Sequence, residues 1–209
     1  LDLTGRQLGP ADALLLAGCL RHSSRLTALD ISSNRLCGVW VEGGVQIGRF
    51  NPRPMMELMG PVHYMGGNGT GAITKLASNQ LWAIHATAMG EALVMAVKSG
   101  VDLSRARGAL KIGASESWCM HHDAPSVFQG HYDPSFTLDL CMKDLGLIVG
   151  ACDTAGTESP VTRLVHDRFA KAHRTYGGNK GELHVVKLEE DAAGVNLQMP
   201  GDWVPHWEK

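Results

Sequence analysis

One segment of this 209-residue chain constrains its fold more than any other. From Thr70 to Lys98 the sequence contains no proline, is rich in alanine, leucine and methionine, and is followed by Gly100 at a position where helices commonly end. The pattern predicts a single helix of about 30 residues, roughly 45 Å long. Because apolar residues occupy more than one face of this helix, we expect it to be central and largely buried.

A glycine-rich turn leads directly into this helix. Gly69 and Gly71 stand at the turn, and Lys75 and Asn79 follow inside the helix at intervals of four residues. That spacing places the ammonium and the amide on one helix face, about one turn apart. Glycines beside them let another molecule approach the start of the helix closely. The arrangement suits a small polar substrate, although a lysine on a helix is, taken alone, more often a solvated surface charge.

The glycine spacing excludes two nucleotide-binding motifs in this segment. A dinucleotide-binding turn needs Gly-x-Gly-x-x-Gly between a strand and a helix. Counted from Gly67 the third glycine position is Ala72, and counted from Gly69 it is Thr74. A Gly-x-x-x-x-Gly-Lys-Ser/Thr loop does not occur here either. By its own spacing, the turn is therefore not a phosphate-binding loop.

The composition excludes several classes of partner. The formal net charge is -2 at pH 7 and the basic residues are scattered, so there is no electrostatic basis for binding nucleic acid or an anionic membrane. No apolar stretch reaches the roughly 18 residues needed to span a bilayer. The five cysteines include no Cys-x-x-Cys pair, which indicates reduced thiols and an intracellular compartment, either cytoplasmic or organellar.

The first 38 residues carry a pattern of their own. The segment Leu1–Leu8 is echoed 28 residues later by Leu29–Leu36, with an alanine- and leucine-rich helical run between the two. This resembles a leucine-rich repeat of the ribonuclease-inhibitor type, in which Asn34 fills the asparagine-ladder position and Arg6 replaces it in the first copy. About three repeats are needed to bury the apolar face of such a solenoid. We therefore expect residues 1–38 to be a small α/β leucine-rich-repeat fragment.

Residues 39–65 are expected to be a linker, because glycines and prolines interrupt regular structure there. Within this linker the sequence favours a short helix around Met55–Met59 and a short strand at Val62–Met65.

Residues 66–209 are expected to form a helical domain. Asp102 is a helix-capping residue, and Pro160 stands where a helix can begin. After the long helix, we predict further helices over residues 103–110, 135–155, 160–173 and 183–193. Five helices without alternating strands predict an all-α bundle.

A loop is predicted from Trp118 to Pro134, where three histidines are found. His121, His122 and His131 have no His-Glu-x-x-His spacing, and no cysteine pair accompanies them. We interpret them as part of a polar loop and assign no metal site to the chain.

Two motifs of the helical region resemble the β-hydroxyacid dehydrogenases, which include 3-hydroxyisobutyrate dehydrogenases and glyoxylate/succinic semialdehyde reductases. The first is Gly69-Thr-Gly71 with Lys75 and Asn79 at the following four-residue intervals. The second is the run from Phe136 to Leu145, which is similar to the family's Phe-x-Leu-x-Leu-x-x-Lys-Asp-Leu helix. The resemblance covers about residues 54–200. It implies a bundle around one long central helix, like the C-terminal domain of 6-phosphogluconate dehydrogenase.

The resemblance also implies roles for individual residues. Lys75 would be the general acid/base at the substrate hydroxyl or carbonyl, where an ammonium can stabilise developing negative charge. Asn79, Gly71 and Phe136 would bind the substrate, a small 3-hydroxy acid or aldehyde acid. Lys143 would approach the nicotinamide of NAD or NADP. The neighbouring Asp144 is expected to cap its own helix or to pair within it, rather than to contact the substrate.

One departure from the family sets the expected behaviour of the chain. Family members bind NAD(P) through an N-terminal Rossmann domain with a Gly-x-Gly-x-x-Gly turn, and residues 1–65 contain no such turn. We interpret Val41–Gly44 as a vestige of the last strand of that domain. Because a hydride donor needs a dedicated binding site, we expect the 209-residue chain alone to be inactive.

Two functions remain open at this point. The chain is the catalytic half of an NAD(P)-dependent dehydrogenase, or it is a non-catalytic helical dimerisation module fused to a leucine-rich-repeat interaction protein. A dinucleotide-binding turn in a preceding segment would favour the first, and further 28-residue repeats would favour the second. Since the family pairs through this helical domain, we expect a homodimer or higher oligomer under either interpretation.

Overall fold

The computed structural model describes residues 63–201 and, for the backbone, residues 40–42 and 45–47. The chain divides into two compact units, Leu1–Met65 and Gly66–Lys209. In the first unit, strands β1 (Trp40–Glu42) and β2 (Val45–Ile47) pair antiparallel. The expected leucine-rich-repeat fragment and the helix expected around Met55–Met59 lie outside the described residues.

Two expectations for the linker can be compared with the structure. Val41 does lie in a strand, but its partner is the neighbouring strand β2, so the described pairing is that of a local hairpin. The strand expected at Val62–Met65 is wrong for His63, Tyr64 and Met65, which form no regular structure. These three side chains are exposed and pair with no strand among the described residues, and Gly66 follows at a φ of 109°. A segment whose sequence favours a strand is stable as a strand only when it pairs with another strand.

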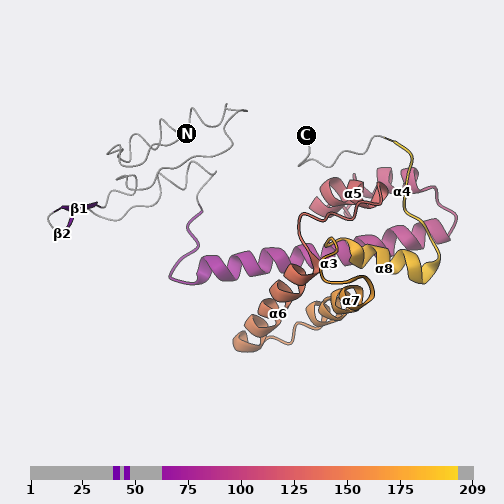
Figure 1. The fold of residues 1–209 in the computed structure, drawn as a ribbon. Helices are drawn as coiled ribbons and strands as arrows, with labels where there is room; N and C mark the ends of the chain where they lie inside the picture. Colours follow the sequence, from indigo (N-terminus) through magenta and orange to yellow (C-terminus); the bar gives the residue numbers. More distant parts are fainter. Residues whose placement is uncertain (1–39, 43–44, 48–62, 202–209) are drawn as a thin grey trace, which may run out of the picture. The chain divides into compact units, whose positions relative to one another are not determined.

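Helix α3 spans Thr70–Lys98, the bounds that the sequence predicted (Figure 1). Gly69 is the residue just before the helix, and its φ of 90° favours glycine. The Thr70 hydroxyl closes the turn by donating to the Gly67 carbonyl at 2.7 Å. The helix ends where Gly100 has a φ of 85° and the amide of Val101 returns to the carbonyl of Ala96 at 3.0 Å.

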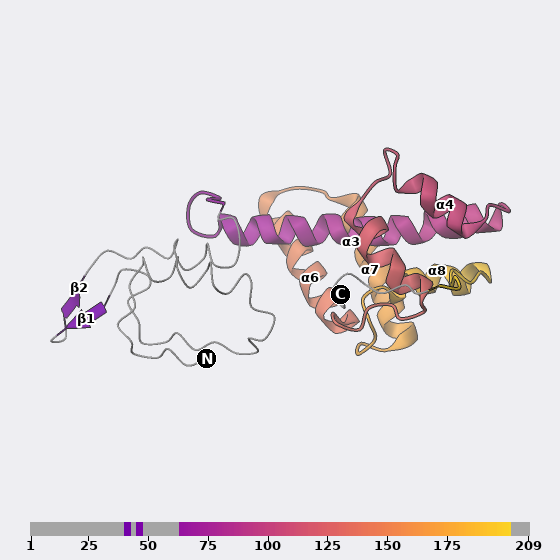
Figure 2. The ribbon, with the colours of Figure 1, turned by 90° about the horizontal axis from the view of Figure 1, so that it is seen from above.

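The expectation that α3 is largely buried holds only for its second half. Ala86 and Leu93 are fully buried, whereas Ile73 and Leu81 are each 57% exposed. The first turns of α3 extend past most of the bundle and face mainly the C-terminal part of α6 (Leu138–Ala155) (Figure 2). The sequence could not reveal this, because apolar residues on several faces predict burial only where other elements reach the helix.

Four of the other helices pack around α3. These are α4 (Leu103–Leu110), α6, α7 (Pro160–Tyr176) and α8 (His184–Ala193). Among them, α6 and α7 contact residues of the first half of α3. Figure 2 shows α6 and α8 along one side of α3 and α4 along the other. The backbones of α3 and α8 approach closely at Gly90, where an added Cβ would lie 3.1 Å from the Val186 side chain. Residues 66–201 thus form the predicted all-α bundle around one long helix.

The loop predicted from Trp118 to Pro134 is wrong in its first part. The structure has a π-helical turn, η1 (Cys119–Asp123), followed by the short helix α5 (Ala124–Phe128). Pro125 lies in the first turn of α5. Backbone N–H groups in the first turn have no acceptor within the helix, so a proline there costs no hydrogen bond. Every residue of α5 is buried, so tertiary packing rather than local propensity accounts for this helix.

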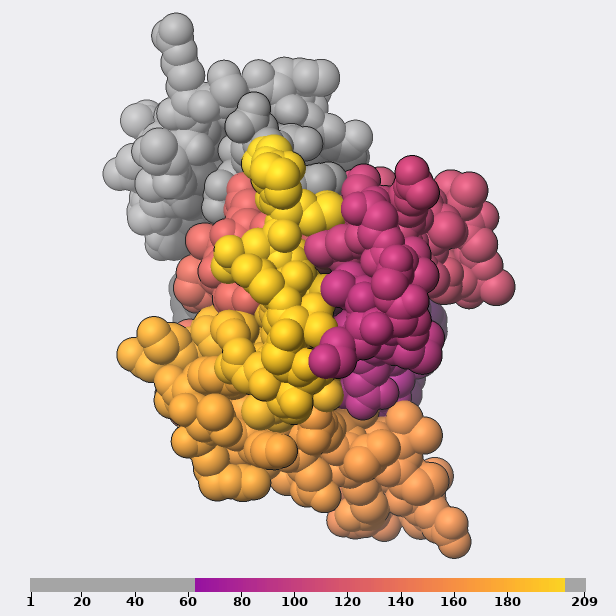
Figure 3. All heavy atoms as spheres, turned by 90° about the vertical axis from the view of Figure 1, so that its right-hand side faces the viewer, coloured from indigo at the N-terminus to yellow at the C-terminus, as the bar shows by residue number. Residues whose placement is uncertain are grey.

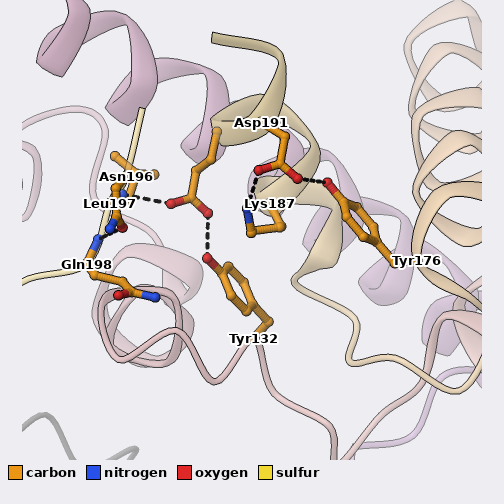
Figure 4. A network of polar contacts seen from close by, with 8 residues as sticks. Tyr132, Tyr176, Lys187, Asp191, Asn196, Leu197 and Gln198 are labelled. Carbon is orange, nitrogen blue, oxygen red and sulfur yellow. Dashed lines mark hydrogen bonds and ion pairs between the residues drawn. The ribbon is translucent and has the colours of Figure 1, made fainter. Parts of the chain in front are cut away.

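The segment after α8 is held on the bundle by a buried carboxylate. Glu190 is 1% exposed and accepts hydrogen bonds from the Tyr132 hydroxyl and the Leu197 amide, each at 2.7 Å (Figure 4). In Figure 3 the yellow band, which includes α8 and this last segment, lies beside the end of α3 in magenta, and the amide of Met199 donates to the carbonyl of Phe128 at 3.1 Å. Among the described residues no helix is both long and apolar enough to cross a membrane.

Candidate active site

Lys75 and Asn79 lie on one face of α3 and contact each other. The Lys75 ammonium donates to the Asn79 amide oxygen at 2.5 Å. The amide nitrogen of Asn79 donates in turn to a carboxylate oxygen of Asp144, on α6, at 2.8 Å. A side-chain amide can serve both partners because it carries an acceptor and a donor.

Asp144 makes the contact expected within its own helix and a second contact outside it. Its Oδ1 atom pairs with the adjacent Lys143 at 2.9 Å. Its Oδ2 atom accepts from Asn79 on another helix, because α6 packs across α3 at this level. The Asp144 side chain is 17% exposed and that of Lys143 is 60% exposed. Asp144 is therefore the inner member of the pair and Lys143 the outer one.

A cavity of about 250 Å³ opens beside these groups. It is enclosed by α3, the start and middle of α6, and the loop before α8. Its lining combines four polar or charged side chains with apolar walls, and its residues are Lys75, Asn79, Trp82, Ala83, Phe136, Cys141, Asp144, Leu145, Ile148 and Glu182. Among the residues singled out from the sequence, Lys75, Asn79 and Phe136 line the cavity, whereas Gly71 and Lys143 do not.

Phe136 and Glu182 are held together through the backbone. The Glu182 amide donates to the Phe136 carbonyl at 2.9 Å, and Thr137 and Gly181 form an antiparallel bridge. Gly181 permits this approach, because a Cβ there would lie 2.2 Å from the carbonyl oxygen of Tyr132. Two walls of the cavity are thus fixed by main-chain contacts between segments far apart in the sequence.

Two titratable groups in the cavity have shifted pKa values. Burial, together with the carboxylates of Asp133 and Asp123, raises the pKa of Glu182 to about 8. Burial, followed by the charges of Glu182 and Asp144, also raises the pKa of the Cys141 thiol. A thiol held neutral in this way is a weak nucleophile. The cavity is therefore suited to hydrogen bonding and proton transfer rather than to covalent catalysis by cysteine.

The glycine turn leaves open space before α3. A Cβ added at Gly67, Gly69 or Gly71 would meet no atom within 4 Å. Gly71 lies one helical turn before Lys75 on the same face. The surface leading from the turn to the ammonium is therefore unobstructed by neighbouring described residues.

Two lining residues that can form hydrogen bonds, Trp82 and Glu182, were not predicted from the sequence. Trp82 follows Asn79 by three residues. Because residues three or four apart lie on the same helix face, the spacing also predicts that Trp82 lies on the face of Lys75 and Asn79. Its indole nitrogen donates to a carboxylate oxygen of Asp123 at 2.9 Å. Glu182 precedes α8 in a loop, and no local pattern in the sequence could have linked it to α3.

Two of the three histidines in and after η1 contact other polar side chains. His121 lies 3.2 Å from Glu116, and His131 contacts the Ser126 hydroxyl at 3.3 Å. Within residues 63–201 no three potential metal-ligating side chains of the His, Cys, Asp and Glu types come together.

Comparison with known proteins identifies similar sequences and folds. A family model described as the NAD-binding domain of NADP-dependent 3-hydroxyisobutyrate dehydrogenase matches residues 69–188, which is more than half of the chain. A probable 3-hydroxyisobutyrate dehydrogenase-like 1 protein, mitochondrial, of Arabidopsis thaliana is 33% identical over 147 residues, covering 69% of this chain and 43% of that protein. An L-threonate dehydrogenase of Cupriavidus necator is 25% identical over 135 residues, covering 64% of this chain and 46% of that protein.

Among solved structures, a 3-hydroxyisobutyrate dehydrogenase of Salmonella typhimurium aligns with a TM-score of 0.62 at 20% identity, covering 87% of this chain and 67% of that one. At this identity the likeness concerns the fold alone. The matched region spans about half the length of the two sequence relatives.

Proposed function

This chain belongs to the family of the NAD-binding domain of NADP-dependent 3-hydroxyisobutyrate dehydrogenase, and from this premise we propose that it is the catalytic and substrate-binding half of an NAD(P)-dependent hydroxyacid dehydrogenase. The observation that carries the proposal is the hydrogen-bonded series of Lys75, Asn79 and Asp144 at the wall of one cavity. It puts a proton carrier next to two groups that can orient a small polar molecule.

The chemistry assigned to Lys75 follows from the reaction. NAD(P)⁺, when bound, would supply the hydride acceptor for the carbon that bears the substrate hydroxyl. As that hydroxyl becomes a carbonyl, the Lys75 amine takes its proton, and in the reverse direction the ammonium returns it to the developing alkoxide. Asn79 holds Lys75 in position and Asp144 holds Asn79. Proton transfer and orientation thus reside on two packed helices, which are rigid elements.

The described residues fit the edge of an NAD(P) site. Lys143 presents an exposed ammonium next to the cavity, where it would hold the cofactor by charge. The open space around Gly67, Gly69 and Gly71 leaves room for an approaching molecule. Because a nicotinamide dinucleotide needs a much larger surface, we propose that the rest of its site lies on a Rossmann domain outside residues 66–201.

The cavity supports a small substrate. Its volume of about 250 Å³ suits an acid of only a few carbons. We propose a 3-hydroxy acid or an aldehyde acid, such as 3-hydroxyisobutyrate, glyoxylate or succinic semialdehyde. Phe136 and Gly71 would contact this substrate, the first from the cavity wall and the second from the glycine turn.

We also propose that the chain forms a homodimer or a higher oligomer. Leu147 on α6 and Leu164 on α7 are 55% and 64% exposed, although both are large apolar side chains. Such exposed apolar surface is often covered by a partner.

The proposal is tested by titrating the ¹⁵N-labelled chain with 3-hydroxyisobutyrate and following its backbone amide resonances. We expect shifts concentrated at residues 75–83, 136–148 and 182. They should be lost in Lys75→Met and kept in Lys98→Met, which removes an exposed lysine at the far end of the same helix. An unperturbed spectrum, or equal responses of the two variants, would contradict the assignment of this cavity. The purified chain should not oxidise NADPH with glyoxylate or succinic semialdehyde. Steady oxidation would contradict the proposal that the rest of the cofactor site lies on a separate Rossmann domain.

A further inference from the structure

Glu182 differs from the other polar groups of the cavity. Lys75, Asn79 and Asp144 are engaged with one another through hydrogen bonds. The half-buried Glu182 side chain lines the same cavity but receives no hydrogen bond and forms no ion pair with any residue that the structure describes. Its backbone is fixed by the bond from its amide to the Phe136 carbonyl. The carboxyl group is therefore held at the cavity wall without a hydrogen-bond donor from residues 63–201.

The two acidic residues that influence Glu182 do have donors. Asp133 accepts hydrogen bonds from the amide of Ser135 at 2.9 Å and from its hydroxyl at 2.5 Å. Asp123 accepts from the indole nitrogen of Trp82 at 2.9 Å. These bonds occupy acceptor positions of both carboxylates, whereas Glu182 accepts no hydrogen bond from the described residues around it. Burial and the charges of Asp133 and Asp123 raise its pKa to about 8, so at pH 7 the group is mostly neutral.

A neutral carboxyl group has a distinctive binding preference. It carries one O–H donor and retains an acceptor oxygen, which matches the donor and acceptor of an alcohol. Leaving such a group half-buried without a partner costs free energy, and a ligand hydroxyl would offset that cost. A methyl group at the same place would not. The other walls near it include Phe136, Leu145 and Ile148, which offer no hydrogen bonds from their side chains.

We propose that Glu182 determines substrate specificity: its carboxyl group binds a hydroxyl on the carbon chain of the substrate, so the cavity takes polyhydroxylated short-chain acids in preference to methyl-branched acids of similar size. The inference rests on the proposed function, because it assumes that the reacting hydroxyl lies at Lys75. The contact of Glu182 with the substrate would be a second polar contact, on a different cavity wall from Lys75. A site built to hydrogen-bond a substrate hydroxyl rejects the analogue that lacks it, since the protein group is then left unpaired.

The test compares two acids on the complete 209-residue chain at pH 7. Dissociation constants are measured by ligand-observed NMR for L-threonate, which carries three hydroxyl groups, and for 3-hydroxyisobutyrate, which carries one hydroxyl and a methyl branch. The variants are Glu182→Met, of similar length but without hydrogen bonds, and Glu182→Gln, which keeps a donor and an acceptor. Circular dichroism checks that both retain their helices, and Lys75→Met identifies binding to the cavity.

We expect the wild-type chain to bind L-threonate about tenfold more tightly than 3-hydroxyisobutyrate, as one added hydrogen bond of roughly 1.4 kcal/mol predicts. Glu182→Gln should keep most of this preference. Glu182→Met should weaken L-threonate about tenfold and leave 3-hydroxyisobutyrate within about twofold.

The possible contrary results separate the inference from the proposed function. If both acids bind in a way that depends on Lys75, but the ratio of their dissociation constants is unchanged in Glu182→Met, the inference is wrong and the proposed function stands. A wild-type preference for 3-hydroxyisobutyrate overturns the inference whether or not the variants fold. If neither acid binds the wild-type chain, the proposed substrate site itself fails, and the role of Glu182 fails with it.

Discussion

At the scale of single residues, Asn79 joins the charged groups of two helices. Its amide oxygen accepts from Lys75 and its amide nitrogen donates to Asp144. An aspartate at this position would put two carboxylates side by side, and a leucine would leave both partners without their bonds. The amide thus couples the position of the proposed acid/base to the packing of α6 on α3.

This coupling predicts a non-additive pair of substitutions. Asn79→Ala should destabilise the fold by about 1–3 kcal/mol, because it leaves a mostly buried oxygen of Asp144 without a donor. The double variant with Asp144→Ala should show a coupling energy of roughly 0.5–3 kcal/mol in urea unfolding. Ser78→Ala, at an exposed neighbouring position of the same helix, should change stability by less than about 0.5 kcal/mol. Strict additivity of the pair would show that the hydrogen bond contributes nothing.

A pH dependence follows from Glu182. Its pKa rises from an ordinary 4.5 to about 8 on folding, so between these values the unfolded chain releases a proton that the folded chain keeps. The stability contributed by this group is therefore complete below pH 4.5 and is lost as the pH rises through 8. At about 1.4 kcal/mol per pKa unit, the loss is on the order of a few kcal/mol.

The measurement is the difference in unfolding free energy between Glu182→Gln and the wild-type chain across this pH range. Because glutamine does not ionise, the variant should gain stability relative to the wild-type chain as the pH rises. A difference that stays constant with pH would contradict the raised pKa.

At the scale of secondary-structure elements, the start of α3 shows how two nearby glycines differ. Gly69 has a φ of 90°, which costs a residue with a Cβ about 1–2 kcal/mol, whereas Gly71 lies inside the helix with open space around it. Gly69→Ala should therefore weaken the first turn by this amount. Gly71→Ala should strengthen it by up to about 1 kcal/mol, because alanine is the better helix former.

Amide hydrogen exchange at residues 73–76 measures both effects, with faster exchange in the first variant and slower exchange in the second. If the proposed contact of Gly71 with substrate holds, Gly71→Ala will also weaken the binding of 3-hydroxyisobutyrate. Unchanged binding would remove Gly71 from the site while leaving the helix prediction intact.

Elements with strong local signals were predictable, and those that depend on distant packing were not. The absence of proline and the glycines at both ends specified α3, and the capping residue Asp102 specified α4. The helix α5 carries Pro125 and is stabilised by burial, so its sequence resembled a loop. The same reasoning applies to the site. Residues on one helix face were recognisable by spacing, whereas Glu182 reaches the cavity only through a loop packed against the residues before α6.

At the scale of the whole molecule, the proposed dimer predicts a measurable change of mass. Leu147→Glu combined with Leu164→Glu should convert the dimer to a monomer in sedimentation equilibrium, because the charges would have to be buried at the contact. Ile112→Glu, at an 86% exposed position in the loop after α4, is the matched control and should leave the mass unchanged. A wild-type chain that is monomeric at high micromolar concentration would contradict the proposal.

The chain spans about half the length of the relatives it matches, and we propose that the hydride site lies on a Rossmann domain outside residues 66–201. In the proposed function, residues 66–201 would supply the proton-transfer group and the substrate cavity, and a Rossmann domain would supply the cofactor site. Joining the two halves artificially should then restore the reaction.

The most direct test of this account is the turnover of a chimaera. The part of the Cupriavidus necator L-threonate dehydrogenase that this chain does not match is joined ahead of residue 66, and reduction of NAD⁺ or NADP⁺ by L-threonate and 3-hydroxyisobutyrate is followed. The account predicts turnover whose kcat falls about 10²- to 10⁴-fold in Lys75→Met and stays within about twofold in Lys98→Met. Equal turnover by the Lys75→Met chimaera and the unsubstituted chimaera would contradict the assignment of Lys75 as the acid/base.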